Sequence, residues 1–132
     1  MELEIFTLAD FAQDNNTKLT VVGTFDSIYA PGFPATHPNC YVATRMRFGA
    51  SEEGNHDFKL TLTDADGKEV IQPITGNITV GKAANDQASS INIIIHFAQL
   101  QFPKQGKYAF QLYLDGEWRS GLGLYLHPMP VK

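Results

Sequence analysis

Apolar and polar residues alternate with a period of two along most of the chain, which is the pattern of β-strands with one buried face. The clearest case is the segment 108–114, in which four large apolar side chains share one face: Tyr108, Phe110, Leu112 and Leu114. The same alternation occurs at 18–25, 40–48, 58–63 and 122–126, and no segment keeps a helical period. The pattern therefore predicts an all-β protein.

The segment 91–97 departs from this alternation because it is apolar on both faces, with Ile94 opposite Ile91, Ile93 and Ile95. Two explanations stay open. The segment is either a central strand buried on both faces or a strand whose outer face is covered by another part of the chain.

Turn-forming residues separate the predicted strands at 14–17, 64–67 and 114–117. Asp, Asn and Gly favour such turns because they tolerate the positive φ angles that tight hairpins need. Roughly eight short strands at a spacing of about 8–12 residues are typical of a sandwich or a barrel. We therefore predict a single domain over residues 1–132, an antiparallel β-sandwich of about 7–8 strands, with a small barrel as the alternative.

Tyr108 refines this fold prediction. It follows a turn and Gly106 and opens an alternating strand. In immunoglobulin-like sandwiches, a tyrosine in this position bonds its hydroxyl to backbone a few residues upstream. The segment therefore favours an immunoglobulin-like sandwich, while the simpler alternative is that Tyr108 is only the first core aromatic residue of its strand.

The segment 23–40 carries four of the residues that we single out for binding. Its three prolines, at positions 31, 34 and 38, restrict the backbone and make the connection stiff. Stiff loops with large side chains are common recognition sites, because little entropy is lost on binding. The candidates are Asp26, Tyr29, Phe33 and His37. Alternatively, the loop crosses between the sheets and packs Phe33 and Tyr29 into the end of the core.

Arg45 and Arg47 are predicted on the outward face of their strand and complete the candidate binding residues. If the strand that carries Lys59 is a neighbour, the three cations form a small basic patch suited to a phosphate or carboxylate. The alternative is a solvated sheet face whose arginines pair with Glu52 and Glu53.

Composition and charge exclude several classes of partner. The chain has 132 residues, 43% of them hydrophobic, and a net charge of −4. This balance argues against binding nucleic acid or anionic lipid, and no apolar run approaches the roughly 18 residues of a membrane helix. Because the first residues lack a secretory signal and the single Cys40 forms no internal disulfide, we expect a cytoplasmic protein.

Motifs for catalysis, metals or cofactors are absent from the sequence. Its four histidines are scattered singly, at positions 37, 56, 96 and 127, which does not indicate a zinc site. We therefore expect no catalytic residues, no cofactor and no metal. The remaining enzyme hypothesis requires Asp26, His37 and Cys40 to converge around one cleft.

Several segments together resemble an uncharacterised bacterial family of small single-domain proteins, a domain of unknown function. The resemblance rests on the segments 4–10, 12–14 and 19–30, on Phe33-Pro34 and His37-Pro38 with Cys40, and on the run 45–48. It implies a free-standing β-sandwich without a known activity, and it brings no catalytic residues to this chain.

These observations lead to a hypothesis of a non-catalytic cytoplasmic β-sandwich that acts by protein–protein interaction or self-association. The apolar segment 91–97 and the stiff aromatic loop support it, because exposed apolar surface often marks an interface. The alternative is a small-molecule or carbohydrate-binding module that uses outward rings for stacking. Those rings belong to Tyr113, Trp118 and Tyr125.

Overall fold

A computed structural model describes residues 1–82 and 89–130 and confirms the all-β class. Within these residues there is one short 3-10 helix, Ala50–Glu52, and no α-helix. The nine strands, one or two more than the sequence predicts, are β1 (Glu2–Asn15), β2 (Lys18–Thr24), β3 (Ser27–Ala30), β4 (Ala35–Phe48), β5 (Gly54–Thr63), β6 (Ile74–Val80), β7 (Ser89–Phe102), β8 (Gly106–Leu114) and β9 (Glu117–Pro128).

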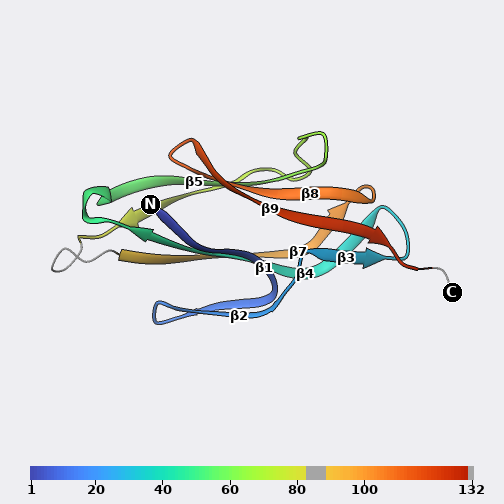
Figure 1. Ribbon diagram of the computed structural model, residues 1–132, viewed down its shortest axis with the longest axis horizontal. Coiled ribbons are helices and arrows are strands. Elements are labelled where there is room, and N and C mark those ends of the chain that lie inside the picture. Colours follow the sequence, from blue (N-terminus) through green and yellow to red (C-terminus); the bar gives the residue numbers. More distant parts are fainter. Residues whose placement is uncertain (83–88, 131–132) are drawn as a thin grey trace.

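The strands form two sheets that face each other across the core (Figure 1). The first sheet has the order β2-β1-β4-β7 and the second the order β3-β9-β8-β5-β6. All neighbours are antiparallel except β3 and β9, which run parallel, with Ser27 opposite Tyr125. The expectation of a purely antiparallel arrangement is therefore wrong at this edge. The parallel pair arises because the chain crosses from β2 in the first sheet to β3 in the second.

The core is built from the faces that the alternation predicts. The four large side chains of β8 point inward and are almost completely buried. Val42, Met46 and Phe48 of β4 pack opposite them and are fully buried. Burying one such side chain contributes about 1.5–3 kcal/mol, so this double layer is the main stabilising feature of the fold.

The second half of β1 folds back over the outer face of its own sheet. The pairing partner of β1 changes at Ala9, which pairs with Tyr41 of β4 on one side and with Thr24 of β2 on the other. In Figure 1 the β1–β2 hairpin lies below the layer of β1, β4 and β7. The carbonyl of Thr17, in the turn of this hairpin, accepts hydrogen bonds from Arg45 and Asn92. The hairpin therefore adds a third layer to the two sheets.

This third layer decides between the two explanations of the segment 91–97. β7 is an edge strand, because its neighbour in the sheet is β4 alone among the strands of the described residues. The central-strand explanation is therefore wrong. Ile94 faces outward beside Asn92, which binds the hairpin, and it is half-buried. A strand with a covered outer face is thus the explanation that holds.

Tyr108 makes the hydrogen bonds expected of it. Its hydroxyl donates to the carbonyl of Lys104 at 2.6 Å and accepts from the amide of the same residue at 3.2 Å. Both are backbone groups upstream of the strand, so this corner is confirmed. The predicted turns are confirmed as well, with Asn16, Thr17, Asp115 and Gly116 at positive φ in the two tight hairpins.

Candidate functional site

The predicted binding loop is shorter than the sequence indicates. Tyr29 belongs to β3, and His37 already lies in β4, so only residues 31–34 connect the two strands. The peptide bond between Phe33 and Pro34 is cis. Phe33 is half-buried against the core, whereas the Tyr29 ring is 57% exposed and stacks on His127 with centroids 4.9 Å apart. The alternative that packs both rings into the core is therefore right for Phe33 and wrong for Tyr29.

Tyr29 and His37 line the same small hollow at this end of the molecule. Its volume is about 320 Å³, and Pro31, Pro34 and Phe102 complete much of its wall. The Nε2 atom of His37 is buried and has no hydrogen-bond partner among the described residues.

Asp26 does not join them. It borders a separate hollow, between Thr24 of β2 and Leu122 of β9.

Arg45 and Arg47 do not form the predicted basic patch. Both pair with Glu4 of β1, at 3.2 Å and 2.6 Å, and not with Glu52 or Glu53. Lys59 lies on β5 in the other sheet, so it faces away from them. Arg45 stands eight positions beyond His37 on β4, which places the two about 26 Å apart. The six candidate binding residues therefore do not converge.

The structure places Cys40 where its thiol is unreactive. The side chain is fully buried, and burial together with the nearby Asp10 carboxylate raises its pKa to about 11. A nucleophilic cysteine needs a depressed pKa, because the thiolate is the reactive form. Groups of three or more side chains able to hold a metal are also absent from residues 1–82 and 89–130.

A larger cavity opens between the edge strands of the two sheets. We call it the edge groove; its volume is about 540 Å³, and it is lined by apolar side chains from β5, β6 and β7 together with polar β6 residues at its rim. Its apolar lining consists of Phe58, Ile74, Gly76, Ile78, Ile91, Ile93 and Ile95. The three isoleucines of β7 face the core side of their strand, opposite Met46, Thr44 and Val42 of β4. They are only half-buried, because the sheets remain apart along this side.

The groove is flanked by two strand edges. β6 and β7 each have one partner, β5 and β4 respectively, among the strands that the structure describes. The 14 residues of β7 contain no charged residue and no proline. Natural proteins use charges, prolines and bulges to keep an exposed edge from pairing. On β7 the irregularity comes only near its end, at Gln99, which has a φ of 55°.

The sequence singles out the apolar strand but does not reveal the groove. The segment 91–97 is recognisable from its composition, whereas β6 carries no comparable signal. β6 and β7 follow each other in the chain, and they border one groove because each lies at the edge of its own sheet. The uncharged stretch of β7 does not by itself indicate an edge, since central strands in a sandwich also read as uncharged.

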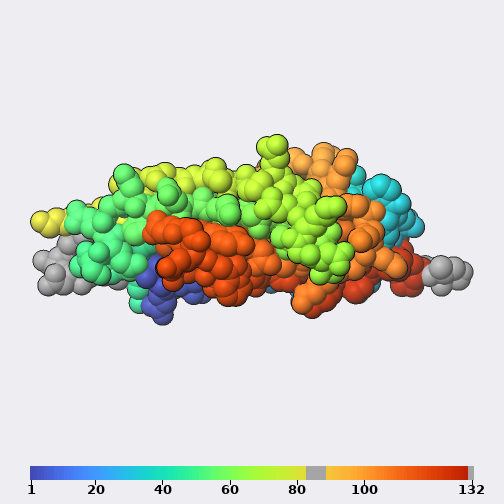
Figure 2. Space-filling view, turned by 90° about the horizontal axis from the view of Figure 1, so that it is seen from above, coloured from blue at the N-terminus to red at the C-terminus, as the bar shows by residue number. Residues whose placement is uncertain are grey.

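Aromatic rings gather on the outer face of the second sheet, the side seen in Figure 2. Trp118 and Tyr125 are 57% and 41% exposed, as expected for outward rings. They lean over Gly121 and Gly123, where an added Cβ would meet the rings at 3.6 Å and 3.8 Å. The indole Nε1 donates to Gln111 Oε1 at 2.7 Å, which orients the ring. We call this surface the ring platform.

Tyr113, the third predicted ring, contributes less to this surface. It is half-buried, and the Lys59 ammonium lies over its ring at 4.5 Å from the centroid. Its face is therefore already occupied by a cation.

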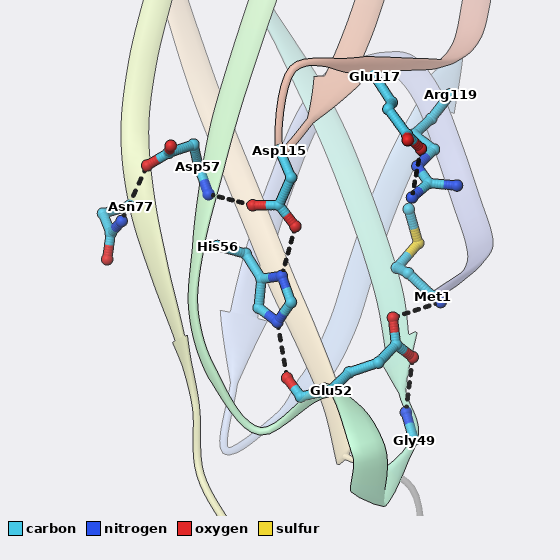
Figure 3. A network of polar contacts seen from close by, with 9 residues as sticks. All are labelled: Met1, Gly49, Glu52, His56, Asp57, Asn77, Asp115, Glu117 and Arg119. Atoms are coloured by element: carbon cyan, nitrogen blue, oxygen red, sulfur yellow. Dashed lines mark hydrogen bonds and ion pairs between the residues drawn. The ribbon is translucent and has the colours of Figure 1, made fainter.

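A polar network that sequence reasoning missed ties the β8–β9 turn to β5 (Figure 3). His56 Nδ1 lies 2.7 Å from Asp115 Oδ2, and its Nε2 lies 2.6 Å from the carbonyl of Glu52. The other carboxylate oxygen of Asp115 accepts the amide of Asp57 at 2.9 Å. Glu52 in turn contacts the Met1 amine at 2.6 Å.

The contacts in this network shift three pKa values. Hydrogen bonds to the Glu52 carbonyl and to Asp115 raise the pKa of His56. The bond from His56 lowers the pKa of Asp115, and the bond from the Met1 amine lowers that of Glu52. His56 thus joins three segments of the chain, and Asp57 and Gly116, the chain neighbours of His56 and Asp115, line a hollow beside β6.

The structure also contains no helix that is long and apolar enough to cross a membrane within the described residues.

Comparison with known proteins agrees with the resemblance read from the sequence. No curated protein is similar to the chain at a significant level. The sequence profile of one family, described as a family of unknown function (DUF6941), matches residues 4–127. This match includes all or most of each of the nine strands. The chain therefore belongs to the family of unknown function DUF6941.

Proposed function

We propose that this protein is a non-catalytic interaction module that binds a polypeptide strand along its edge groove. The observation that carries the proposal is the apolar groove of about 540 Å³ between two strand edges without further partners in the described residues. We regard the scaffold as an immunoglobulin-like sandwich, which the Tyr108 corner supports. We place it in the cytoplasm, where the buried thiol of Cys40 stays reduced.

An extended strand is the occupant that fits such a site best. The free edge of β7 presents backbone N–H and C=O groups that an added strand pairs with. Alternate side chains of that strand then enter the groove and cover Ile91, Ile93 and Ile95. Affinity comes from the backbone bonds and from apolar burial, so neither a catalytic group nor a cofactor is required.

Site-specific photo-crosslinking of the full chain in cells tests this proposal. A photoreactive residue replaces Ala98 on the β7 edge or Thr79 on the groove side of β6, both of which are exposed. Asp66, in the exposed turn after β5, is the matched control position. We expect a discrete crosslinked polypeptide from positions 79 and 98 and none from position 66.

A second substitution links the crosslink to the groove. Ile93→Lys places a charge among the apolar lining and should reduce the crosslinking yield about tenfold or more, while Thr63→Lys on the outer face of β5 should leave it unchanged. Circular dichroism confirms that both variants are folded. Equal crosslinking from position 66, or a yield that Ile93→Lys leaves intact, contradicts the proposal.

The ring platform supports a second candidate function, carbohydrate binding. Exposed flat rings held over a glycine floor suit the apolar faces of sugars. Trp118 is the sole tryptophan, so its fluorescence reports directly on this surface. We expect a saturable change on titration with soluble oligosaccharides that Tyr125→Ala abolishes and Tyr41→Ala, on the opposite sheet, does not. A flat titration across neutral and acidic glycans rejects this candidate.

A further inference from the structure

We propose that the strand bound at this edge is β7 of a second copy of the chain, paired antiparallel about Ile94. The inference rests on the proposed function and names its partner. It follows from the pattern of side chains on β7, from the lack of charge along the strand and from the size of the contact that results.

The side chains of β7 divide cleanly between the two faces of its sheet. Ile91, Ile93, Ile95 and Phe97 lie opposite the inward residues of β4, whereas Ile94 lies opposite Ala43 and His96 opposite Tyr41 on the outer face. Directly opposite residues of an antiparallel pair always share a face. A second β7 therefore has to present apolar residues inward and mixed residues outward.

Pairing Ile94 with itself meets this requirement at every position. Two-fold symmetry then sets the remaining pairs, and each apolar inward residue meets another apolar one. The inward pairs are Ile91 with Phe97 and Ile93 with Ile95, and the outward pairs are Asn92 with His96 and Ser90 with Ala98. Moving the centre by one residue, to Ile93, places Asn92 opposite Ile94, which is a poorer match.

The distribution of charge allows the β7 strands of two copies to come together. The chain carries a net charge of −4, so two copies repel each other on average. β7 is free of that repulsion, because none of its 14 residues is charged. The edge of β6 beside it, Ile74–Val80, is uncharged as well. A charged peptide finds no partner for an ion pair on this uncharged edge. A second β7, which is uncharged itself, meets no electrostatic repulsion there.

The size of the contact is adequate for a stable pair. The matched register runs from Ser89 to Gln99, where the positive φ ends the regular edge. At about 3.4 Å per residue this length is about 37 Å, and the side of two stacked sheets with their side chains is about 20 Å deep. The contact then covers roughly 700 Å² per copy, close to the roughly 800 Å² per partner of standard complexes.

The pairing also closes the open side of each molecule. Two four-stranded sheets join into one of eight strands, and the isoleucines of both copies form a continuous inner row. The apolar lining that is half-exposed in one chain is thereby covered.

Disulfide trapping tests the register directly. In a Cys40→Ala background, which removes the native thiol, Ile94→Cys places two cysteines opposite each other at a Cα distance of about 4.5–5.5 Å. Asn92→Cys is the matched control on the same face: each residue 92 then stands four positions from its copy, about 14 Å farther along the strand. We expect mild oxidation to give a covalent dimer with Ile94→Cys and only a monomer with Asn92→Cys.

Sedimentation velocity of the unmodified protein gives an independent readout. We expect a species of twice the 14.6 kDa chain mass, which Ile94→Lys converts to a folded monomer. A monomer at all concentrations, or linkage through Asn92→Cys but not through Ile94→Cys, overturns this inference. A monomer that still crosslinks to a different protein from position 98 leaves the proposed function standing, whereas loss of both signals rejects both.

Discussion

At the scale of single residues, two polar groups hold segments that the apolar core does not reach. The Tyr108 hydroxyl closes the turn before β8 through the backbone of Lys104. His56 connects β5 to the β8–β9 turn and to the 3-10 helix through Asp115 and the Glu52 carbonyl. In each case a hydrogen bond within the protein replaces one to water. A substitution that removes the bond therefore measures its contribution to stability.

Replacing Tyr108 by phenylalanine keeps the buried ring and removes the hydroxyl. The Lys104 carbonyl and amide then lose their common partner, so we expect the free energy of unfolding to fall by about 1–2 kcal/mol. Denaturation in urea measures the change. Tyr125→Phe, at an exposed ring, should change the free energy by less than about 0.5 kcal/mol and is the control. Equal effects of the two substitutions contradict a structural role for the corner.

The contacts of His56 predict a pH dependence. Since its pKa is raised by folding, the charged form is favoured in the native state. The contribution of protonated His56 to the stability of the folded state is therefore complete below the ordinary pKa of about 6.5. It is lost as the pH rises through the raised pKa. The lowered pKa of Asp115 keeps the opposite charge in place down to acidic pH.

We expect the free energy of unfolding of the native chain to decline from pH 6.5 upward more steeply than that of His56→Gln. Asp115→Asn should also lower the pKa of His56, which NMR titration of the imidazole measures directly. A pKa of His56 at or below the ordinary histidine value of about 6.5 would contradict the geometry described for this network.

At the scale of elements, the β1–β2 hairpin acts as a cover for the first sheet. Its position depends on Arg45, which contacts Glu4, Asn92 and the carbonyl of Thr17. Arg47, two residues along the same strand, pairs with Glu4 only and is about half exposed. The two arginines look equivalent in the sequence, and the tertiary structure gives them different roles.

These roles predict different costs on substitution. Arg45→Met should lower the free energy of unfolding by about 1–2 kcal/mol, because the hairpin loses its link to β4. Arg47→Met removes a surface ion pair and should cost at most about 0.5 kcal/mol. Hydrogen exchange gives a local readout: amides of β2 should lose protection in the Arg45 variant alone. Faster exchange in both variants, or in neither, contradicts the assignment.

At the scale of the whole molecule, one side of the two-sheet fold is closed and the other is open. On the closed side the chain passes directly from β2 to β3, and the Phe25 amide donates to the Leu8 carbonyl at 3.0 Å. On the open side β6 and β7 leave the edge groove between them. Apolar burial is incomplete there within one chain, so stability is expected to depend on what occupies that side.

Pairing of two copies makes the thermal midpoint depend on protein concentration. Because dilution favours separated chains, we expect Tm to fall by roughly 2–3 °C for each tenfold dilution. Ile94→Lys should have a lower Tm that no longer changes with concentration. Differential scanning calorimetry over a hundredfold concentration range measures both. A Tm of the native chain that is independent of concentration argues for a monomer.

The sequence alone was sufficient for the fold class, the inward faces of β4, β5 and β8, the hairpin turns and the Tyr108 corner. Each of these depends on residues close together in the chain, where side-chain period and backbone preference act directly. Strand order, the folded-back hairpin and the parallel β3–β9 pair lie outside such local rules.

The candidate site shows the same division between local and long-range information. Composition marked the strand of Ile91, Ile93 and Ile95, yet only the tertiary structure made it an edge beside β6. It also separated Arg45 from His37 and buried Cys40. An alternating pattern states which face of a strand avoids water, but the neighbour along its edge is chosen by backbone hydrogen bonds that nearly any sequence can make. For this reason the sequence determined the faces of the strands, and the tertiary structure decided their edges.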